Sequence, residues 1–195
     1  MSAVPATHYT IQEYLAREKV ATTKSEFYRG QIFAMSGASI RHNMIAVNVL
    51  GRLFGKLDGT SCRPFGSDQR VRVAANTLDT YPDVAVVCGE IERDQEDRNA
   101  IANPRVIFEV LSPSTENYNR GKKFDLYRDL ASLQMYVLVS QSEPLVERFV
   151  RQKNGSWVLD CFKRLDDVVE LGAIGCSLTL AEIYRGVEFG EEPEA

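Results

Sequence analysis

The chain has 195 residues, of which 44% are hydrophobic and 26% are charged, and its formal net charge is −4. This composition is that of a globular domain rather than a disordered chain, and the acidity argues against a protein that coats nucleic acid through a large basic surface. The start shows no signal peptide, and no run approaches the ~18 consecutive apolar residues of a membrane helix. We therefore expect a soluble cytoplasmic protein, folded as a single domain over residues 1–195.

The N-terminal part shows signals of two helices and a hairpin. Residues 10–18 are expected to form a short helix, because a threonine and a glutamate stand at capping-box spacing. Two short extended runs flank Arg29 and Gly30, as in a β-hairpin. Apolar residues at helical spacing predict the first main helix over about residues 39–57, and its apolar stripe should cover a sheet.

Five strand-like segments follow: SCRPFGSDQRVRVAA, YPDVAVVCG, NPRVIFEVLS, LQMYVLVS and LVERFVRQ. RVRV alternates, as in an edge or half-exposed strand, whereas VAVV, VIFEVL and MYVLV are continuous, as in central strands covered on both faces. A second main helix is expected at about residues 119–130, between the third and fourth segments. This order predicts a mixed α/β sheet flanked by helices. Further short strands, a closing helical turn and an acidic tail over about residues 188–195 should follow.

The cysteines are widely separated and include no C-x-x-C pair: Cys62, Cys88, Cys161 and Cys176. Only two histidines, His8 and His42, could add imidazole ligands. We therefore expect neither a zinc site nor a disulfide framework, and we predict buried free thiols.

One carboxylate interrupts the most apolar of the strand-like runs. Glu109 stands at the centre of VIFEVL, and an ionised carboxylate inside a buried strand is costly unless something pairs with it. Asp83 stands at the mouth of the preceding strand. If the loop 89–103 joins these two strands as a hairpin, both side chains can converge on one face. Two such carboxylates repel each other unless a cation lies between them, and their hard oxygens suit Mg²⁺ or Mn²⁺.

Helical geometry distinguishes the two lysines that follow this strand. At ~100° per residue, Lys123 falls within roughly 30° of the centre of the apolar stripe, whereas Lys122 falls on the opposite, solvated side. A lysine that points into a protein is rare unless it is paired, so Lys123 needs Glu109 or a substrate oxygen. The alternatives are a purely structural ion pair between Glu109 and Lys123, and a strand-end cap at Asp83. Tyr127 lies one helical turn after Lys123 and is expected to pack in the core rather than to belong to the site.

An ordered set of motifs spans most of the chain and resembles a known family. The set comprises S-E-F-Y-R-G-Q-I, M-S-G-A-S-x-x-H, S-D-Q-R-V, Y-P-D-V, a glutamate on the next strand, S-P-S-T, R-G-K-K-x-x-x-Y and L-x-L-A-E-I-Y. It resembles the bacterial putative restriction endonuclease family within the PD-(D/E)XK nuclease superfamily. The resemblance implies a restriction endonuclease-like fold: a mixed β-sheet flanked by helices, with an αβββαβ core over about residues 39–152 and an extra N-terminal hairpin.

The resemblance also implies roles for particular residues. In the superfamily the aspartate and the glutamate hold the metal, and a lysine two residues after the glutamate orients the attacking water. That position is Leu111 here, which implies that the lysine role has moved to Lys123. The implied catalytic residues are Asp83, Glu109 and Lys123, with Asp83 and Glu109 as metal ligands. Three residues in the matching segments are candidates for closing the site, namely Glu26, His42 and Asp68. The alternatives are a plain hairpin residue for Glu26 and a helix-start residue that caps a turn for His42.

The implied function is that of a metal-dependent endonuclease that hydrolyses phosphodiester bonds. DNA is the expected substrate ahead of RNA, Mg²⁺ or Mn²⁺ the cofactor, and a homodimer the assembly. Arg70, Arg72 and Arg120 are candidates for phosphate contacts, with solvated surface charge as the alternative for each. A nuclease-like fold that only binds nucleic acid or another protein is a second possibility. Glycoside hydrolysis is a weaker third, because the chain has a single tryptophan, Trp157, as a sugar platform.

Overall fold

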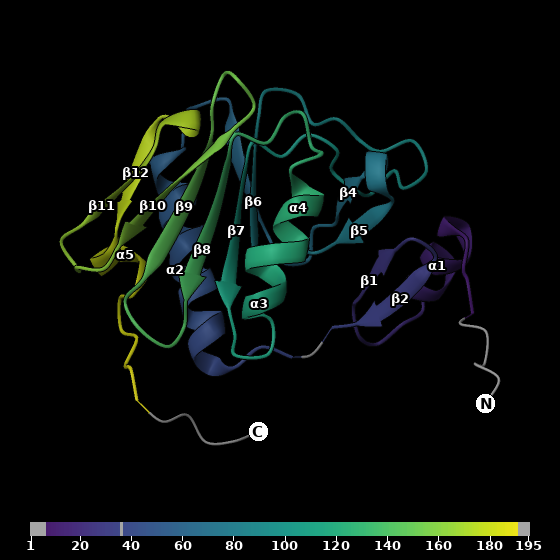
Figure 1. Cartoon of the computed structure of the whole chain (residues 1–195), viewed down its shortest axis with the longest axis horizontal. Coiled ribbons are helices and arrows are strands. Elements are labelled where there is room, and N and C mark those ends of the chain that lie inside the picture. Colours follow the sequence, from purple (N-terminus) through teal and green to yellow (C-terminus); the bar gives the residue numbers. More distant parts are fainter. Residues whose placement is uncertain (1–6, 36, 191–195) are drawn as a thin grey trace.

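The computed structural model describes residues 7–35 and 37–190 and arranges them as two main β-sheets with helices packed around them (Figure 1). The larger sheet has the strand order β10-β9-β8-β7-β6-β3. Its neighbouring strands are antiparallel except for β7 and β8, which run parallel and are connected by a helical segment. Its strands are β3 (Cys62–Gly66), β6 (Val84–Cys88), β7 (Val106–Leu111), β8 (Met135–Ser140), β9 (Val146–Arg151) and β10 (Trp157–Phe162).

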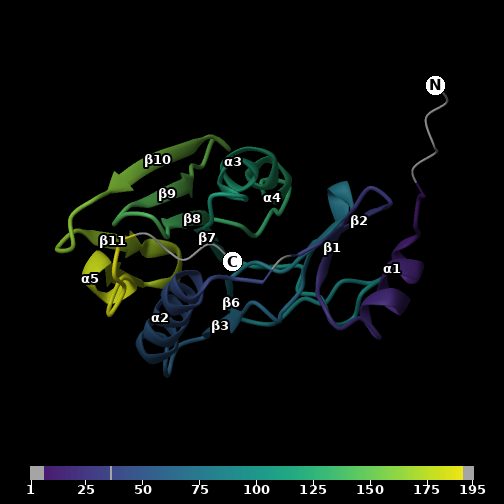
Figure 2. The same ribbon diagram turned by 90° about the horizontal axis from the view of Figure 1, so that it is seen from below.

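A smaller sheet lies beside the larger one, with the strand order β2-β1-β5-β4 (Figures 1 and 2). Its strands are β1 (Ser25–Tyr28), β2 (Gln31–Ala34), β4 (Val71–Val73) and β5 (Leu78–Thr80). Arg29 and Gly30 join β1 to β2 with φ values of 47° and 81°, the left-handed pair that a tight hairpin turn needs. The predicted N-terminal hairpin is therefore present, and helix α1 (Ile11–Glu18) packs against Phe27 on its outer face.

Helices cover both faces of the larger sheet (Figure 2). Helix α2 (Ile40–Lys56) buries its apolar stripe against one face. A continuous helical segment covers the other face and consists of α3 (Glu116–Tyr118), a π-helical turn (Asn119–Lys123) and α4 (Phe124–Tyr127). The predicted mixed sheet flanked by helices is thus confirmed, and the second helix begins three residues earlier than its apolar pattern indicated.

Strand β7 divides its side chains between these two faces, because successive side chains of a strand point to opposite sides. Phe108 and Val110 belong to the apolar cluster that includes the buried stripe of α2. Ile107 and Leu111 belong to the cluster that includes the residues of α4. The alternation places Glu109 with Ile107 and Leu111, on the face from which Lys123 approaches.

The C-terminal part closes the core on the α2 side. Strands β11 (Val168–Leu171) and β12 (Cys176–Thr179) form a two-stranded sheet, and helix α5 (Leu180–Ile183) follows it. Thr179 and Glu182 cap this helix with a complete capping box. The further short strands and the closing helical turn that the sequence predicts are therefore confirmed.

The composition of SCRPFGSDQRVRVAA suggested a single strand, but the segment forms two strands, β3 and β4, which belong to different sheets. A turn closed by the Gln69 N–H on the Gly66 carbonyl directs the chain from β3 in the larger sheet to β4 in the smaller one. Strand β4 is an edge strand, but it is buried rather than half exposed. The reason is that the loop between β6 and β7 lies along it, with the Arg72 N–H bonded to the Ile101 carbonyl.

The prediction of free buried thiols is wrong. Cys62 and Cys88 face each other across the β3–β6 pair and form a disulfide, with a sequence separation of 26 residues. The two remaining thiols are not fully buried, since Cys161 is exposed and Cys176 is partly exposed. Residue spacing could not reveal this bond, because it depends on which strands become neighbours.

Thiol titration of the unfolded protein should therefore detect two of its four cysteines before reduction and four afterwards. Because the bond closes a loop of this length, reduction should lower the free energy of unfolding by about 3 kcal/mol, measured by urea denaturation with and without reductant. A Cys161→Ser variant provides the control, since it removes an exposed free thiol and should leave the stability unchanged. Four thiols before reduction would contradict the disulfide.

Two expectations concern the ends of the chain and its solvent environment. The acidic tail is predicted over residues 188–195, and its residues 191–195 lie outside the part of the chain that the structure describes. Within residues 7–35 and 37–190, no helix has the length and apolar character that crossing a bilayer requires.

Candidate active site

Two carboxylates meet where strands β6 and β7 lie side by side. The strands pair with Val84 opposite Phe108, so that one step further along the register Asp83 stands opposite Glu109. The Asp83 carboxylate accepts a hydrogen bond of 2.7 Å from the Val110 N–H, which holds it at the mouth of β6. The hairpin geometry expected from the sequence is therefore present, and both side chains line the same cavity.

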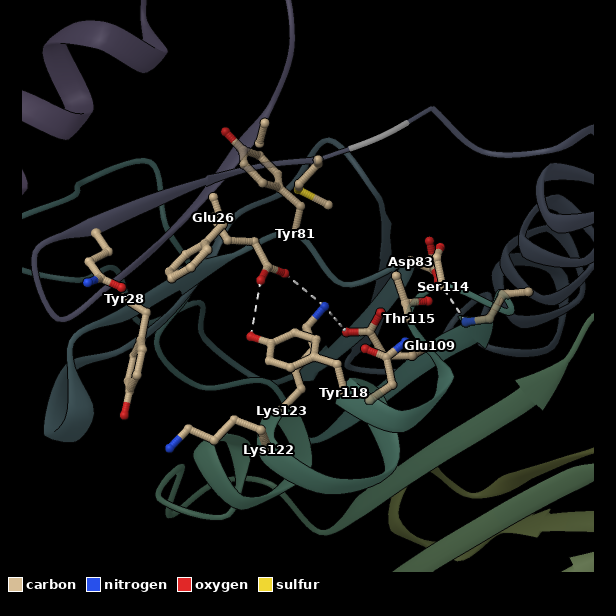
Figure 3. A pocket seen from close by; sticks show the side chains of 16 residues that line it. Glu26, Tyr28, Tyr81, Asp83, Glu109, Ser114, Thr115, Tyr118, Lys122 and Lys123 are labelled. Atoms are coloured by element: carbon tan, nitrogen blue, oxygen red, sulfur yellow. Dashed lines mark hydrogen bonds and ion pairs between the residues drawn. The ribbon is translucent and has the colours of Figure 1, made fainter. Parts of the chain in front are cut away.

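Lys123 approaches these carboxylates from the helical segment, as its place on the apolar stripe predicted (Figure 3). Its Nζ lies 2.8 Å from Glu109 Oε1 and 3.0 Å from Glu26 Oε1. All three residues are buried, although each belongs to a different element: Glu26 to β1, Glu109 to β7 and Lys123 to the π-helical turn. The ammonium thus joins the smaller sheet to the larger one at the site.

Three hydroxyl groups complete this buried cluster, and the sequence did not assign any of them to the site. The Tyr127 hydroxyl donates to Glu109 Oε1 at 2.9 Å, and the Tyr118 hydroxyl donates to Glu26 Oε2 at 3.2 Å. The Thr80 hydroxyl donates to Glu26 Oε1 from the neighbouring strand β5. The sequence favoured plain core packing for Tyr127, and only its spacing of four residues from Lys123 indicated another role.

The π-helical turn explains why Tyr118 and Lys123 act together. Residues five apart lie about 140° apart around an α-helix, but a π-helical turn closes through i→i+5 hydrogen bonds and brings them to one side. The Tyr136 hydroxyl donates to the Asn119 carbonyl at 3.1 Å and so satisfies a polar group within this turn. The local widening brings both side chains to the cavity, Tyr118 to its wall and Lys123 to its floor.

The cluster contains two carboxyl groups, Glu26 and Glu109, and a single ammonium, Lys123, so the two carboxyl groups ionise differently. Burial works to raise the pKa of Glu26, but the Lys123 charge and the hydrogen bonds outweigh it, and this pKa lies below its ordinary value. Burial raises the pKa of Glu109 to about 7, with Lys123 opposing the shift and the Asp83 charge adding to it. The pKa of Lys123 lies well above its ordinary value, because Glu109 and Glu26 outweigh the effect of burial. Lys123 therefore stays protonated, Glu26 balances it, and Glu109 ionises only near neutral pH.

His42 reaches the same site from the first turn of α2. Ser39 caps this helix by accepting a hydrogen bond from the His42 N–H, which fixes the position of the residue. His42 Nε2 lies 3.4 Å from Asp83 Oδ2. Burial works to lower the pKa of His42, but the hydrogen bond and charge of Asp83 outweigh it, so this pKa is raised. His42 is thus placed to hold Asp83 rather than to line the cavity.

The cavity above the carboxylates has a volume of about 590 Å³ and opens between the β1–β2 hairpin and the helical segment (Figure 3). Its floor includes Asp83, Glu109 and Lys123. Its walls are rich in aromatic side chains and include Tyr28, Phe33, Tyr81 and Tyr118, with Lys122 beside them. Lys122 is exposed, as the helical pattern predicted, but it lies at the cavity with its Nζ 5.3 Å from the Tyr28 ring centre.

The remaining candidate residues lie elsewhere and are engaged in other contacts. Asp68 is exposed at the turn after β3 and forms an ion pair of 2.7 Å with Lys24. Arg70 binds Asp97 at 2.6 Å, and Arg72 is buried in ion pairs with Asp79, Asp94 and Glu96. Arg120 is paired with Glu116 and Glu147. None of the four is among the residues that line the cavity, so the structure does not bring them to the carboxylates.

The donor set of the site fits a hard divalent cation with few protein ligands. Asp83 and Glu109 supply carboxylate oxygens, and the Asp83 charge makes ionisation of Glu109 harder, a repulsion that a cation between them would relieve. Within the described chain, no three side chains of His, Cys, Asp or Glu converge as a metal-binding group. A cation held here would therefore keep water or substrate oxygens in its other positions, which is usual for Mg²⁺.

This arrangement defines a class of protein. An antiparallel strand pair that presents an aspartate and a glutamate to one cavity is the arrangement expected of restriction endonuclease-like proteins, although the lysine here comes from the following helix and not from the strand. The chain belongs to the Uma2 family, since the model of this family, described as "Putative restriction endonuclease", matches residues 11–181.

Similar proteins agree with this assignment. The uncharacterized protein slr1290 of Synechocystis sp. is 37% identical over 178 residues, which cover 91% of this chain and 92% of that protein. The uncharacterized protein sll1609 of the same organism is 36% identical over 150 residues, which cover 77% and 85%. The crystal structure of a putative nuclease belonging to DUF820 from Anabaena variabilis covers 94% of this chain and 100% of its own, with a TM-score of 0.73 and 18% identity. It has the same fold.

Proposed function

We propose that the protein is a metal-dependent endonuclease that hydrolyses phosphodiester bonds, in DNA ahead of RNA. The observation that carries this proposal is the meeting of Asp83, Glu109 and Lys123 in one cavity, with 2.8 Å between Lys123 Nζ and Glu109 Oε1. Membership of the Uma2 family supports it. A cytoplasmic location and a homodimeric assembly are also part of the proposal, and the homodimer rests on the family resemblance alone.

Asp83 and Glu109 would hold Mg²⁺ or Mn²⁺. When bound, the cation would neutralise charge on the scissile phosphate and lower the pKa of a coordinated water. Lys123 contributes a fixed positive charge that positions the nucleophile and stabilises negative charge developing on the phosphate. Glu26, with its hydrogen bonds from Thr80 and Tyr118, holds the ammonium in place. His42 positions Asp83 through the contact between its Nε2 and Asp83 Oδ2.

A second candidate is a nuclease-like protein that binds nucleic acid without cutting it. One observation favours it: Leu111 stands where the superfamily has its lysine, and the ammonium of Lys123 is already paired with Glu26 and Glu109. The two candidates differ in a single property, metal-dependent cleavage.

The test is cleavage of supercoiled plasmid, single-stranded DNA and RNA in the presence of Mg²⁺, Mn²⁺ or EDTA. We expect cleavage with either cation and none in EDTA. The Asp83→Asn variant should lose at least about 10²-fold in rate, because a metal ligand is removed. Asp68→Asn is the matched control, since it makes the same chemical change at an exposed carboxylate away from the cavity. A folded wild-type protein that binds these nucleic acids but cuts none would favour the second candidate.

A further inference from the structure

The β1–β2 hairpin presents an aromatic face to the active-site cavity. Side chains of a strand alternate between faces, and residues directly opposite in an antiparallel pair share a face. Glu26 pairs with Phe33 and Tyr28 pairs with Gln31, so these four side chains point to the cavity together. The intervening Phe27 lies on the other face, in the cluster beneath α1.

These aromatic side chains stand above the reactive groups rather than in a core. The Phe33 side chain is 48% exposed, whereas Glu109 and Lys123 are each 4% exposed. Tyr28 and Tyr118 are half-buried, and Tyr118 extends from the helical segment on the other side of the cavity (Figure 3). A phosphodiester must therefore pass an aromatic rim to reach the carboxylates.

The cations at this cavity are too few to bind a strand by charge alone. Of the lysines and arginines in the described chain, only Lys122 and Lys123 line it, and the Lys123 charge is balanced by carboxylates. Arg70, Arg72 and Arg120 are held in ion pairs elsewhere. Since phosphate contacts supply most of the affinity of duplex-binding surfaces, this site needs another source of binding energy, and stacking of bases on aromatic rings is one.

We propose that the cavity binds an unstacked base of a single-stranded or locally unpaired nucleic acid. Phe33 and Tyr28 form one stacking wall, Tyr118 faces them, and Lys122 contacts a phosphate beside the bound nucleotide. A paired base inside a duplex cannot present its face to these rings, so the site discriminates against intact duplex. This inference rests on the proposed nuclease function, because it assumes that the strand reaching the carboxylates is nucleic acid.

The test is fluorescence anisotropy with a labelled 12-nucleotide single strand and a blunt-ended duplex of the same sequence, which has no unpaired loop. Binding is measured for wild-type protein in EDTA and for the Asp83→Asn variant with Mg²⁺, so that no cleavage interferes. We expect the single strand to bind at least about 10-fold more tightly than the duplex, and Phe33→Leu and Tyr28→Leu each to weaken it about 10-fold. Phe54→Leu is the matched control, because Phe54 is a 68% exposed phenylalanine on α2 that does not line the cavity.

The outcomes separate this inference from the proposed function. Single-strand binding that depends on Phe33 but is never followed by cleavage supports the binding of an unstacked base in the cavity (the base site) and contradicts the proposed nuclease activity. Duplex cleavage that is unaffected by Phe33→Leu keeps the nuclease and overturns the base site. Equal binding of both forms, or no single-strand binding under either condition, also overturns the base site.

Discussion

Replacing Lys123 with methionine is expected to slow cleavage strongly and to destabilise the fold. Methionine fills much of the same space but leaves Glu26 and Glu109 buried without their shared cation. Removing one partner of a buried ion pair costs about 3–5 kcal/mol, so urea denaturation should show a loss of about 3 kcal/mol at pH 8. The cleavage rate should fall by about 10²–10³-fold, as for other losses of a fixed charge at a reacting group.

The stability loss should depend on pH in a defined direction. Without Lys123 the pKa of Glu26 should rise from its lowered value, and the pKa of Glu109, which burial already raises, should rise further, because the Lys123 charge lowers both. A raised carboxyl pKa destabilises the fold above the unfolded value and has no effect below it, so the loss should be largest at pH 8 and shrink toward pH 4.5.

Lys122→Met serves as the control for this prediction, because it removes the neighbouring, exposed lysine of the same turn. Its stability should stay within about 0.5 kcal/mol of wild type at both pH values. If Lys123→Met were as stable as Lys122→Met, the ammonium would not be the group that holds the two carboxylates.

The pairing of Glu109 with Lys123 could be predicted because both residues violate a local pattern. A carboxylate in an apolar strand and an ammonium on an apolar helical stripe each need a partner, and few partners were available. Leu111 occupies the strand position of the superfamily's lysine and lies in the buried cluster beneath α4. The cation that pairs with Glu109 therefore has to come from another element. Glu26 followed only from the family resemblance, because its contact with Lys123 depends on how the smaller sheet docks on the larger.

The ion-pair partners of Arg70 and Arg72 could not be predicted from the sequence, because these partners also depend on tertiary structure. Arg70 and Arg72 looked like exposed members of an alternating strand, yet their acidic partners Asp97, Asp94 and Glu96 lie in the loop between β6 and β7. Irregular loops have no periodicity from which their path can be inferred. The Cys62–Cys88 bond depends on strand neighbours in the same way. Local patterns therefore identified which residues needed partners, and tertiary docking decided which partners they received.

Replacing Glu109 with glutamine is expected to move activity and stability in opposite directions. Glutamine keeps the shape of the side chain but removes the negative charge that would hold the cation, so cleavage should fall by about 10²–10³-fold. The ionised form of Glu109 is disfavoured by burial, which raises its pKa to about 7 from an ordinary value of 4.5. The Glu109 carboxyl therefore reduces the free energy of unfolding by about 3 kcal/mol as the pH rises from 4.5 through 7, because this group binds its proton more tightly in the folded state than in the unfolded chain.

Glu109→Gln has no such proton to lose, so in EDTA it should match wild type near pH 4.5 and exceed it by up to about 3 kcal/mol at pH 8. Adding Mg²⁺ should stabilise wild type at pH 8 and leave the variant unchanged, because binding to the folded state alone raises stability. Urea denaturation at the two pH values, with and without Mg²⁺, measures both effects. Glu143→Gln, at an exposed carboxylate, should follow wild type throughout. A Glu109→Gln variant that is less stable than wild type at pH 8 without metal would show that the Glu109 charge stabilises the fold, and the carboxylate would then be structural rather than reserved for a cation.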